Sequence, residues 1–154
     1  MERTEISFLG VANGAYSGTT LAAAIRSADN SASLFDVTPV TFSDLPGSKQ
    51  EVVGIAGVLP SSKRLLLDAS ATESDFKALS LGDYRIIHLA VHGIGSPEFP
   101  DRAALVLGSA EGKGQDGLLQ AREIRELLLR ADLVVLSACE TGSGKLLARI
   151  SHGF

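Results

Sequence analysis

The residues best suited to do chemistry in this sequence are its one cysteine, Cys139, and a histidine, His92. Each follows an apolar run, YRIIHLAV before the histidine and ADLVVLSA before the cysteine. A cysteine attacks as its thiolate, and a neighbouring histidine is the usual group that removes the thiol proton. If both runs are parallel strands, their ends meet at one edge of a sheet, where catalytic groups collect. The pattern indicates a cysteine–histidine dyad, although a lone cysteine is often just a small buried hydrophobic residue.

The loop that carries Cys139 has a second interpretation, as a phosphate-binding loop. The Walker A pattern requires a glycine, four further residues and then Gly-Lys-Ser/Thr, all after a strand. The stretch CETGSGKL keeps Gly144 and Lys145 but has Cys139 in place of the first glycine. Leu146 replaces the hydroxyl that would bind magnesium. A degenerate nucleotide-binding loop is therefore a minor alternative.

His88 and His92 raise the question of a metal site, because they are four residues apart. On a helix, that spacing allows two histidines to bind one zinc ion, as in the H-E-x-x-H pattern. The intervening residues include no glutamate, and the segment has the β-branched composition of a strand. We expect no metal and no cofactor, and we expect His88 to be a packed histidine within a strand.

The elements that must position these groups follow from the hydrophobic pattern. Apolar runs predict strands at 5–11, 62–69, 84–93, 103–109 and 131–138. Helical spacing predicts helices at 19–28, 48–59, 72–79 and 118–130. Ser48, three residues before Glu51, has the spacing of a capping box, and Thr72 stands in the same relation to Asp75. The run 131–138 is typical of a parallel strand that is covered on both faces. The alternation predicts an α/β fold with a mainly parallel sheet.

Composition sets the class of protein and its surroundings. The 154 residues, of which 45% are hydrophobic and 21% charged, suit one globular domain. The net charge is −4 and no lysine/arginine cluster occurs, so we expect no nucleic-acid partner. A single cysteine allows no internal disulfide, and no apolar run approaches the roughly 20 residues that span a bilayer. The first residues lack the pattern of a signal peptide, so we expect a cytoplasmic protein without membrane contact.

Four segments together resemble a known family. They are IIHLAVHG, LVLG, DGLLQAREIREL and ADLVVLSACETGSG, and in this order and spacing they resemble a CHAT domain. The resemblance covers at least residues 45–144, while residues 1–44 fit less closely, with FLGVANG similar to the first strand of the family. CHAT domains are caspase-like and are often attached to TPR repeats. The resemblance implies a three-layer α/β/α sandwich with the histidine and the cysteine at neighbouring strand ends.

The resemblance also implies roles for individual residues. His92 matches the catalytic histidine and Cys139 the nucleophile, whereas His88 matches a position within a strand. Gly93 matches the glycine whose backbone N–H forms the oxyanion hole together with the N–H of Cys139. The implied reaction is hydrolysis of a protein or peptide substrate through an acyl-enzyme, with no third residue obviously required. Ser137 and Glu140 flank the cysteine and are placed to influence its pKa, although Glu140 as an anion would oppose thiolate formation.

The end of the chain departs from the family pattern. Family members continue past the SACETG loop with further elements, whereas this chain ends at KLLARISHGF. We therefore expect residues 1–154 to be one incomplete, CHAT-like domain, the N-terminal portion of it, with an open sheet edge beside the last strand. Repeat modules of the TPR type would then lie on a longer chain. The alternative function is that of a truncated, non-catalytic CHAT module that binds a partner.

Overall fold

The computed structural model describes residues 7–14, 16, 42–59, 62–94, 103–108 and 115–138. The helix predicted at 19–28 lies outside these residues, and so does Cys139. In chain order the elements are β1 (Phe8–Ala12), α2 (Pro46–Val58), β2 (Lys63–Leu67), η1 (Asp68–Ser70), α3 (Glu73–Lys77), η2 (Leu81–Asp83), β3 (Ile86–Ala90), β4 (His92–Ile94), β5 (Ala104–Val106), β6 (Leu118–Gln120), α4 (Ala121–Ile124) and β7 (Leu133–Leu136).

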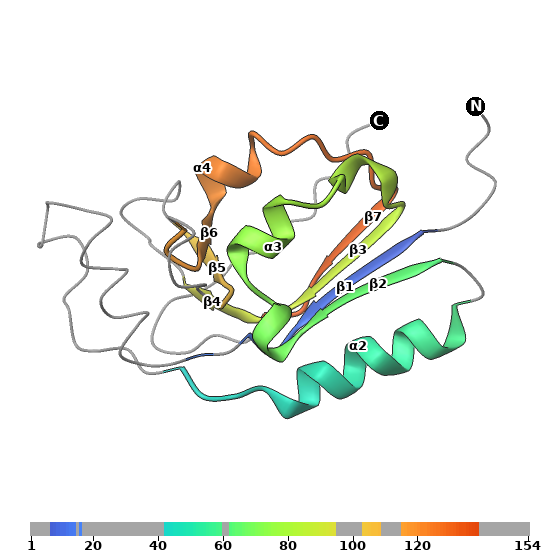
Figure 1. Ribbon diagram of the computed structural model, residues 1–154, viewed down its shortest axis with the longest axis horizontal. Coiled ribbons are helices and arrows are strands. Elements are labelled where there is room, and N and C mark those ends of the chain that lie inside the picture. The colour runs from blue at the N-terminus through green and yellow to red at the C-terminus, as the bar shows by residue number, and fades with distance from the viewer. Residues whose placement is uncertain are drawn as a thin grey trace, which may run out of the picture.

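A parallel four-stranded sheet forms the centre of the molecule. Its strand order is β2-β1-β3-β7, and every neighbouring pair is parallel. Helix α2 lies on one side of this sheet and α3 on the other (Figure 1). The chain therefore has the predicted α/β sandwich, in which helices cover both faces of a mainly parallel sheet.

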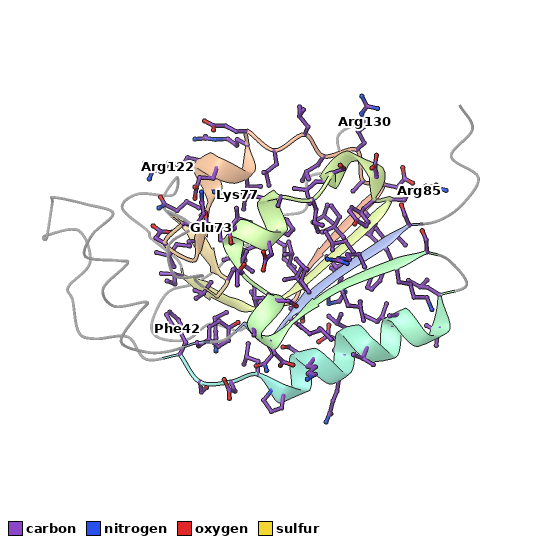
Figure 2. The ribbon with its side chains drawn as sticks, viewed as in Figure 1. Phe42, Glu73, Lys77, Arg85, Arg122 and Arg130 are labelled. Carbon is purple, nitrogen blue, oxygen red and sulfur yellow. The ribbon has the colours of Figure 1, made fainter. Side chains whose placement is uncertain are left out.

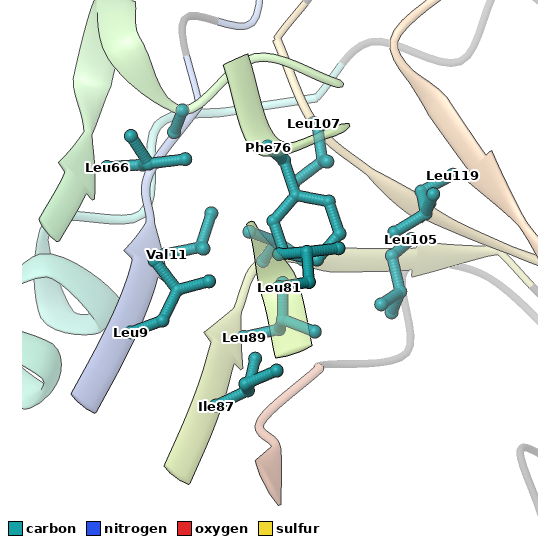
Figure 3. Close-up of a cluster of buried hydrophobic side chains, with 12 residues drawn as sticks. Leu9, Val11, Leu66, Phe76, Leu81, Ile87, Leu89, Leu105, Leu107 and Leu119 are labelled. Atoms are coloured by element: carbon teal, nitrogen blue, oxygen red, sulfur yellow. The ribbon is translucent and has the colours of Figure 1, made fainter. Parts of the chain in front are cut away.

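The two faces of the sheet are built by alternate residues of each strand. On one face Phe8, Ala12 and Ala90 pack against α2. On the other face, the alternate residues of the same strands and of β2 join Phe76 of α3 in the largest buried cluster (Figure 3). They include Leu9, Val11, Leu66, Ile87 and Leu89. Because strand side chains alternate with a period of two, strands covered on both faces must be apolar at nearly every position. This explains the continuous apolar runs in the sequence.

The strand predicted at 84–93 is in fact two strands, and the second of them belongs to a separate, smaller sheet. The parallel strand β3 ends at Ala90, and His92 begins β4 after Val91. Strand β4 pairs with β5, and β5 with β6, all antiparallel. This sheet lies beyond one end of the four-stranded sheet (Figure 1). The predicted strand at 103–109 is confirmed as β5, but it belongs to the second sheet.

The helix predicted at 118–130 is largely wrong. Residues Leu118–Gln120 form β6, and only Ala121–Ile124 are helical. Leu119 is opposite Leu105 in the sheet and is almost completely buried. The amphipathic spacing of this stretch fits a helix equally well, but pairing with β5 gives Leu118 and Leu119 a buried partner strand. Such tertiary packing overrides the intrinsic preference for a helix, which is worth roughly a few tenths of a kcal/mol per residue.

The starts of the two main helices differ from each other in how they are capped. Helix α2 begins at Pro46, so Ser48 lies inside its first turn and the predicted capping box is wrong. Ser48 Oγ instead donates to the Leu45 carbonyl at 2.8 Å. Proline suits the first helical position because the N–H that it lacks has no partner there. The cap predicted at Thr72 is confirmed, since its Oγ1 accepts from Asp75 N at 3.1 Å.

Strand β7 is less covered than its sequence predicts. In the described part of the chain it pairs only with β3, and Leu133 and Leu136 are 49% and 51% exposed. Full burial of this strand was therefore a wrong expectation for those two residues. Among the described helices, none has the length and apolar character needed to cross a membrane.

A buried carboxylate connects α3 to the second sheet. Glu73 is 1% exposed, and its two oxygens bind Lys77 Nζ and the backbone N–H of Gly117, the latter at 2.9 Å. Lys77 also reaches Glu123 Oε1 at 2.8 Å. Figure 2 labels Glu73 and Lys77. Burial raises the pKa of Glu73, and the hydrogen bond from Lys77 opposes that rise. The lysine is thus what allows a charged carboxylate to remain in this position.

We expect Lys77→Met to lower the free energy of unfolding by about 3 kcal/mol at neutral pH, because an unpaired buried charge remains. The folded-state pKa of Glu73 is raised, so its charge costs stability as the pH rises from the ordinary value of 4.5 through the folded-state pKa, and this cost disappears below 4.5. Urea unfolding should therefore show a much smaller loss near pH 4.5, the ordinary pKa of this side chain. Lys63→Met, on an exposed position of β2, is the control. An equal loss at both pH values would contradict this explanation.

Gly10 sits where α2 crosses β1, and we expect Gly10→Ala to cost about 1–3 kcal/mol of stability. A Cβ at this position would overlap Val52 Cγ1 and lie 3.0 Å from Leu65 Cδ2. At Gly57 of helix α2, a Cβ would have no other atom within 4 Å. Gly57→Ala should therefore gain up to about 1 kcal/mol, since alanine favours a helix. Thermal unfolding of both variants tests the difference, and similar melting temperatures would contradict it.

Candidate functional site

The segments that carry the two predicted catalytic residues leave the parallel sheet side by side. Strands β3 and β7 are neighbours, with Leu89 opposite Leu136. Immediately after β7, Ser137 N donates to the Leu89 carbonyl at 2.9 Å. His92 follows Leu89 by three residues, and Cys139 follows Ser137 by two. Cys139 itself lies outside the described residues, so its distance from His92 stays a prediction.

His92 is held in a defined chemical form. The side chain is 2% exposed, and its Nε2 lies 2.7 Å from the carbonyl oxygen of Ser43. A carbonyl can only accept, so Nε2 carries the hydrogen and, in the neutral ring, Nδ1 has the free lone pair. Nδ1 is buried and has no hydrogen-bond partner in the described part of the chain. The ring is therefore set up to accept a proton at Nδ1.

Two aromatic rings enclose the imidazole. Tyr16 meets it edge-on, with ring centroids 4.9 Å apart and an interplanar angle of 62°. Phe42 lies 5.2 Å away at 42° and also contacts Tyr16 (Figure 2 labels Phe42). Such tilted contacts are favourable for aromatic pairs, and aromatic faces attract a cation. The enclosure limits rotation of the His92 ring.

The Tyr16 hydroxyl is the second polar atom of this enclosure. Burial raises its pKa, and the charge of Asp44 adds to the rise. The backbone of Gly14 and that of His92 come near the oxygen and oppose the shift. Neither makes a hydrogen bond of good geometry, and the hydroxyl has no partner among the described residues. The phenol is thus neutral and desolvated.

Sequence reasoning missed all three neighbours of His92. The Ser43 contact is made by the backbone, and because every residue has a carbonyl, its type gives no signal. Tyr16 and Phe42 lie 76 and 50 residues before His92. No local sequence pattern could therefore link them to it. The one available signal was their rarity, since aromatic residues make up 5% of the chain.

The remaining site candidates are placed as follows. Gly93 is buried in β4, opposite Leu105, next to His92 as predicted. His88 lies within β3 on the face covered by α2, which agrees with its expected structural role. His88 Nε2 is 2.8 Å from Glu51 Oε1 of α2, a separation suited to an ion pair when the ring is protonated, although the angle is not that of a hydrogen bond.

Glu51 also connects to the segment that leads to the cysteine. Its second oxygen, Oε2, accepts from Ser137 Oγ at 3.4 Å, a long hydrogen bond. The carboxylate of Glu51 therefore bridges His88 of β3 and Ser137, which follows β7. His88 and His92 have separate surroundings and lie in different sheets.

Neither alternative site gains support within the described residues. No three histidine, cysteine, aspartate or glutamate side chains there are grouped so that they could hold a metal ion. The possible phosphate loop at 139–146 lies outside the described residues.

Comparison with known proteins identifies the family. The family model for the CHAT domain matches residues 4–154. The chain belongs to the CHAT domain family, which is related to the caspase-like peptidases. The match extends on both sides of residues 45–144, where the sequence motifs lie, and does not test whether the domain is truncated. Searches of curated proteins and of solved structures gave no match.

We expect Tyr16→Phe to leave the free energy of unfolding unchanged or to raise it by up to about 1 kcal/mol, because the lost hydroxyl is buried and has no hydrogen-bond partner among the described residues. Tyr16→Leu removes the ring that packs on His92 and Phe42 and should cost about 2 kcal/mol or more. Denaturant unfolding of the two variants measures both values. A clear loss of stability in Tyr16→Phe would show that the hydroxyl does have a partner.

Proposed function

We propose that this CHAT domain is a cysteine peptidase that hydrolyses peptide bonds with His92 and Cys139. The observation that carries the proposal is the state of His92: its Nε2–H is held by the Ser43 carbonyl, and its buried Nδ1 has no partner among the described residues. A histidine that only filled space would more usually have both nitrogens paired. Family membership and the adjacent exits of β3 and β7 support the same assignment.

The proposed reaction uses only groups of the protein and water. Nδ1 of His92 takes the thiol proton of Cys139, and the thiolate attacks the carbonyl carbon of the scissile peptide. The backbone N–H groups of Gly93 and Cys139 stabilise the oxyanion. The C–N bond breaks as His92 returns the proton to the leaving amine, which leaves an acyl-enzyme. Water, deprotonated by His92, then attacks the thioester to release the carboxylic acid and restore the thiol.

The Ser43 carbonyl and the aromatic rings have distinct parts in this reaction. The carbonyl fixes which nitrogen of His92 accepts the proton and remains bound when the ring becomes an imidazolium. The rings of Tyr16 and Phe42 pack against the imidazole and hold it in place for the proton transfer. No carboxylate is needed to orient the histidine.

The setting of the enzyme is part of the same proposal. We place it in the cytoplasm, acting on proteins or peptides, with TPR-type or other modules as partners. The lone cysteine supports this location, because a reactive thiol persists in a reducing compartment.

A non-catalytic module that binds a partner is the second candidate function. It is favoured by the half-exposed leucines of β7, Leu133 and Leu136, on a strand that pairs only with β3 in the described residues. An edge strand of this kind offers free backbone groups and apolar side chains to another chain.

The decisive experiment is alkylation of Cys139 by iodoacetamide as a function of pH. The chain has one cysteine, so all labelling reports on this residue, and Cys139→Ala gives the blank. An unperturbed thiol titrates near ~8.5, and one paired with a histidine titrates several units lower. We expect rapid labelling at neutral pH that falls at least tenfold in His92→Gln, which keeps a donor for Ser43 O but is not a base. His88→Ala is the matched histidine control and should label like the parent.

Labelling that is slow at neutral pH and equal in the parent and His92→Gln would contradict the proposed dyad and favour the partner-binding module. If the dyad is present, Cys139→Ala should also abolish cleavage of a mixed peptide library by any active form of the protein. Mass spectrometry of the library detects new termini. Cleavage that survives Cys139→Ala would remove this residue from the mechanism.

A further inference from the structure

We propose that Asn13 is a positioning residue for the candidate site, and that it acts on His92 through the segment 42–45. This inference rests on the proposed function, because it concerns how the proposed general base is kept in its reactive form. Asn13 does not touch His92. The geometry connects the two through Leu45 and Ser43.

The backbone of Asn13 has an uncommon conformation. Asn13 follows β1 directly and has φ of 49°, in the left-handed region. Asp68, which follows β2 directly, has φ of 52°. They are the two non-glycine residues with positive φ in the described part of the chain, and their side chains bond to each other. Asparagine and aspartate tolerate this region better than other side chains, and such conformations concentrate at functional sites.

The amide of Asn13 has two partners that only an amide can satisfy together. Its Oδ1 accepts from the backbone N–H of Leu45, and its Nδ2 donates to Asp68 Oδ1 at 2.8 Å. A backbone N–H requires an oxygen and a carboxylate requires a donor, so the orientation of the amide is fixed by its surroundings. Aspartate in this position would lack the donor, and serine would be too short to span both partners.

Asp68 anchors the amide to α2. Its second oxygen, Oδ2, binds Lys49 Nζ in the second turn of the helix. The hydrogen bond from Lys49, and then that from Asn13, lower the pKa of Asp68, so the carboxylate is charged at neutral pH. Asn13, Asp68 and Lys49 form what we call the Asn13 cluster, which ties the ends of β1 and β2 to the start of α2.

Leu45 connects the Asn13 cluster to the segment that carries Ser43. Its N–H is bound by Asn13, and its carbonyl accepts from Ser48 N at 3.0 Å and from Lys49 N at 3.3 Å. Leu45 is therefore held from both sides. Two residues earlier, Ser43 presents its carbonyl to Nε2 of His92 at 2.7 Å. If Leu45 loses its anchor, the Ser43 carbonyl is free to move away.

The chemical consequence is a change of tautomer. Without an acceptor at Nε2, the neutral imidazole is free to carry its proton on Nδ1 instead. That tautomer cannot take a proton at Nδ1, so the proposed attack on substrate would slow. A purely structural role for Asn13 predicts lower stability but no change in the tautomer of the folded protein, which separates the two explanations.

The first test uses Asn13→Gly, which keeps the left-handed backbone and removes the side chain. The ¹⁵N shifts of the His92 ring show which nitrogen is protonated. We expect the parent to show protonation at Nε2 alone and Asn13→Gly to show a mixture, with alkylation of Cys139 slower by about tenfold or more. Ser70→Ala is the matched control. It removes hydrogen bonds to Leu67 at the same end of β2, without a connection to segment 42–45.

A second test exchanges the residue types at positions 13 and 68. It also tests the proposal if Asn13→Gly does not fold. Asn13→Asp places two carboxylates together and should disturb the tautomer as Asn13→Gly does. The double variant Asn13→Asp/Asp68→Asn restores one amide and one carboxylate in reversed order, and both residue types tolerate positive φ. We expect it to recover protonation at Nε2 and most of the alkylation rate. The proposal is overturned if folded Asn13→Gly keeps the parent tautomer, or if the folded double variant is no better than Asn13→Asp.

The ring shifts also separate this inference from the proposed function. They report on His92 without any reaction of Cys139. A parent protein with an unreactive thiol would contradict the peptidase proposal, whereas the tautomer comparison would still decide the role of Asn13. Conversely, a reactive parent whose tautomer is unaffected in Asn13→Gly would overturn only the positioning role.

Discussion

The parallel pairing of β1 with both β2 and β3 is the interaction on which the rest of the structure depends. It aligns Ala12 with Leu67 on one side and with Ala90 on the other. The three strands therefore end at one edge, and the residues that follow them are brought together without any sequence proximity. The left-handed turns at Asn13 and Asp68 and the bend at Val91 all begin from this edge. The contacts of His92 with Ser43 and of Asn13 with Leu45 lie beyond it.

The candidate site uses backbone more than side chains. The group that orients His92 is a carbonyl, and its position depends on how segment 42–45 is tied to the ends of β1 and β2. This arrangement avoids the burial of a charge next to the proposed catalytic histidine, which would cost roughly several kcal/mol unless the charge were fully paired. Elsewhere the chain does bury a charge, at Glu73, and there it supplies Lys77 and a backbone N–H as compensation.

The sequence predicted the layered α/β fold because apolar runs and helix signals follow separate, strong patterns. The strands at the centre of the sheet and the cap at Thr72 agree with it. Its errors occur where a local pattern has two solutions. Residues 118–130 fit a helix by spacing, yet pairing of Leu119 with Leu105 makes the first three a strand. In the same way, the run 84–93 gives no sign of the bend at Val91, because it contains no proline and no glycine before Gly93.

For the site itself, the sequence identified His92 by residue type and by its position after a strand, but not what surrounds it. The long-range contacts to Tyr16, Phe42 and the Ser43 carbonyl depend on the tertiary fold. The bend at Val91 has a mechanical meaning as well. It puts His92 on the small antiparallel sheet, while Ser137 directly follows β7 of the large parallel one. The backbone at Val91 thus joins the two sheets. Because β4 pairs with β5, and β5 with β6, a displacement of either strand relative to the large sheet would carry His92 with it.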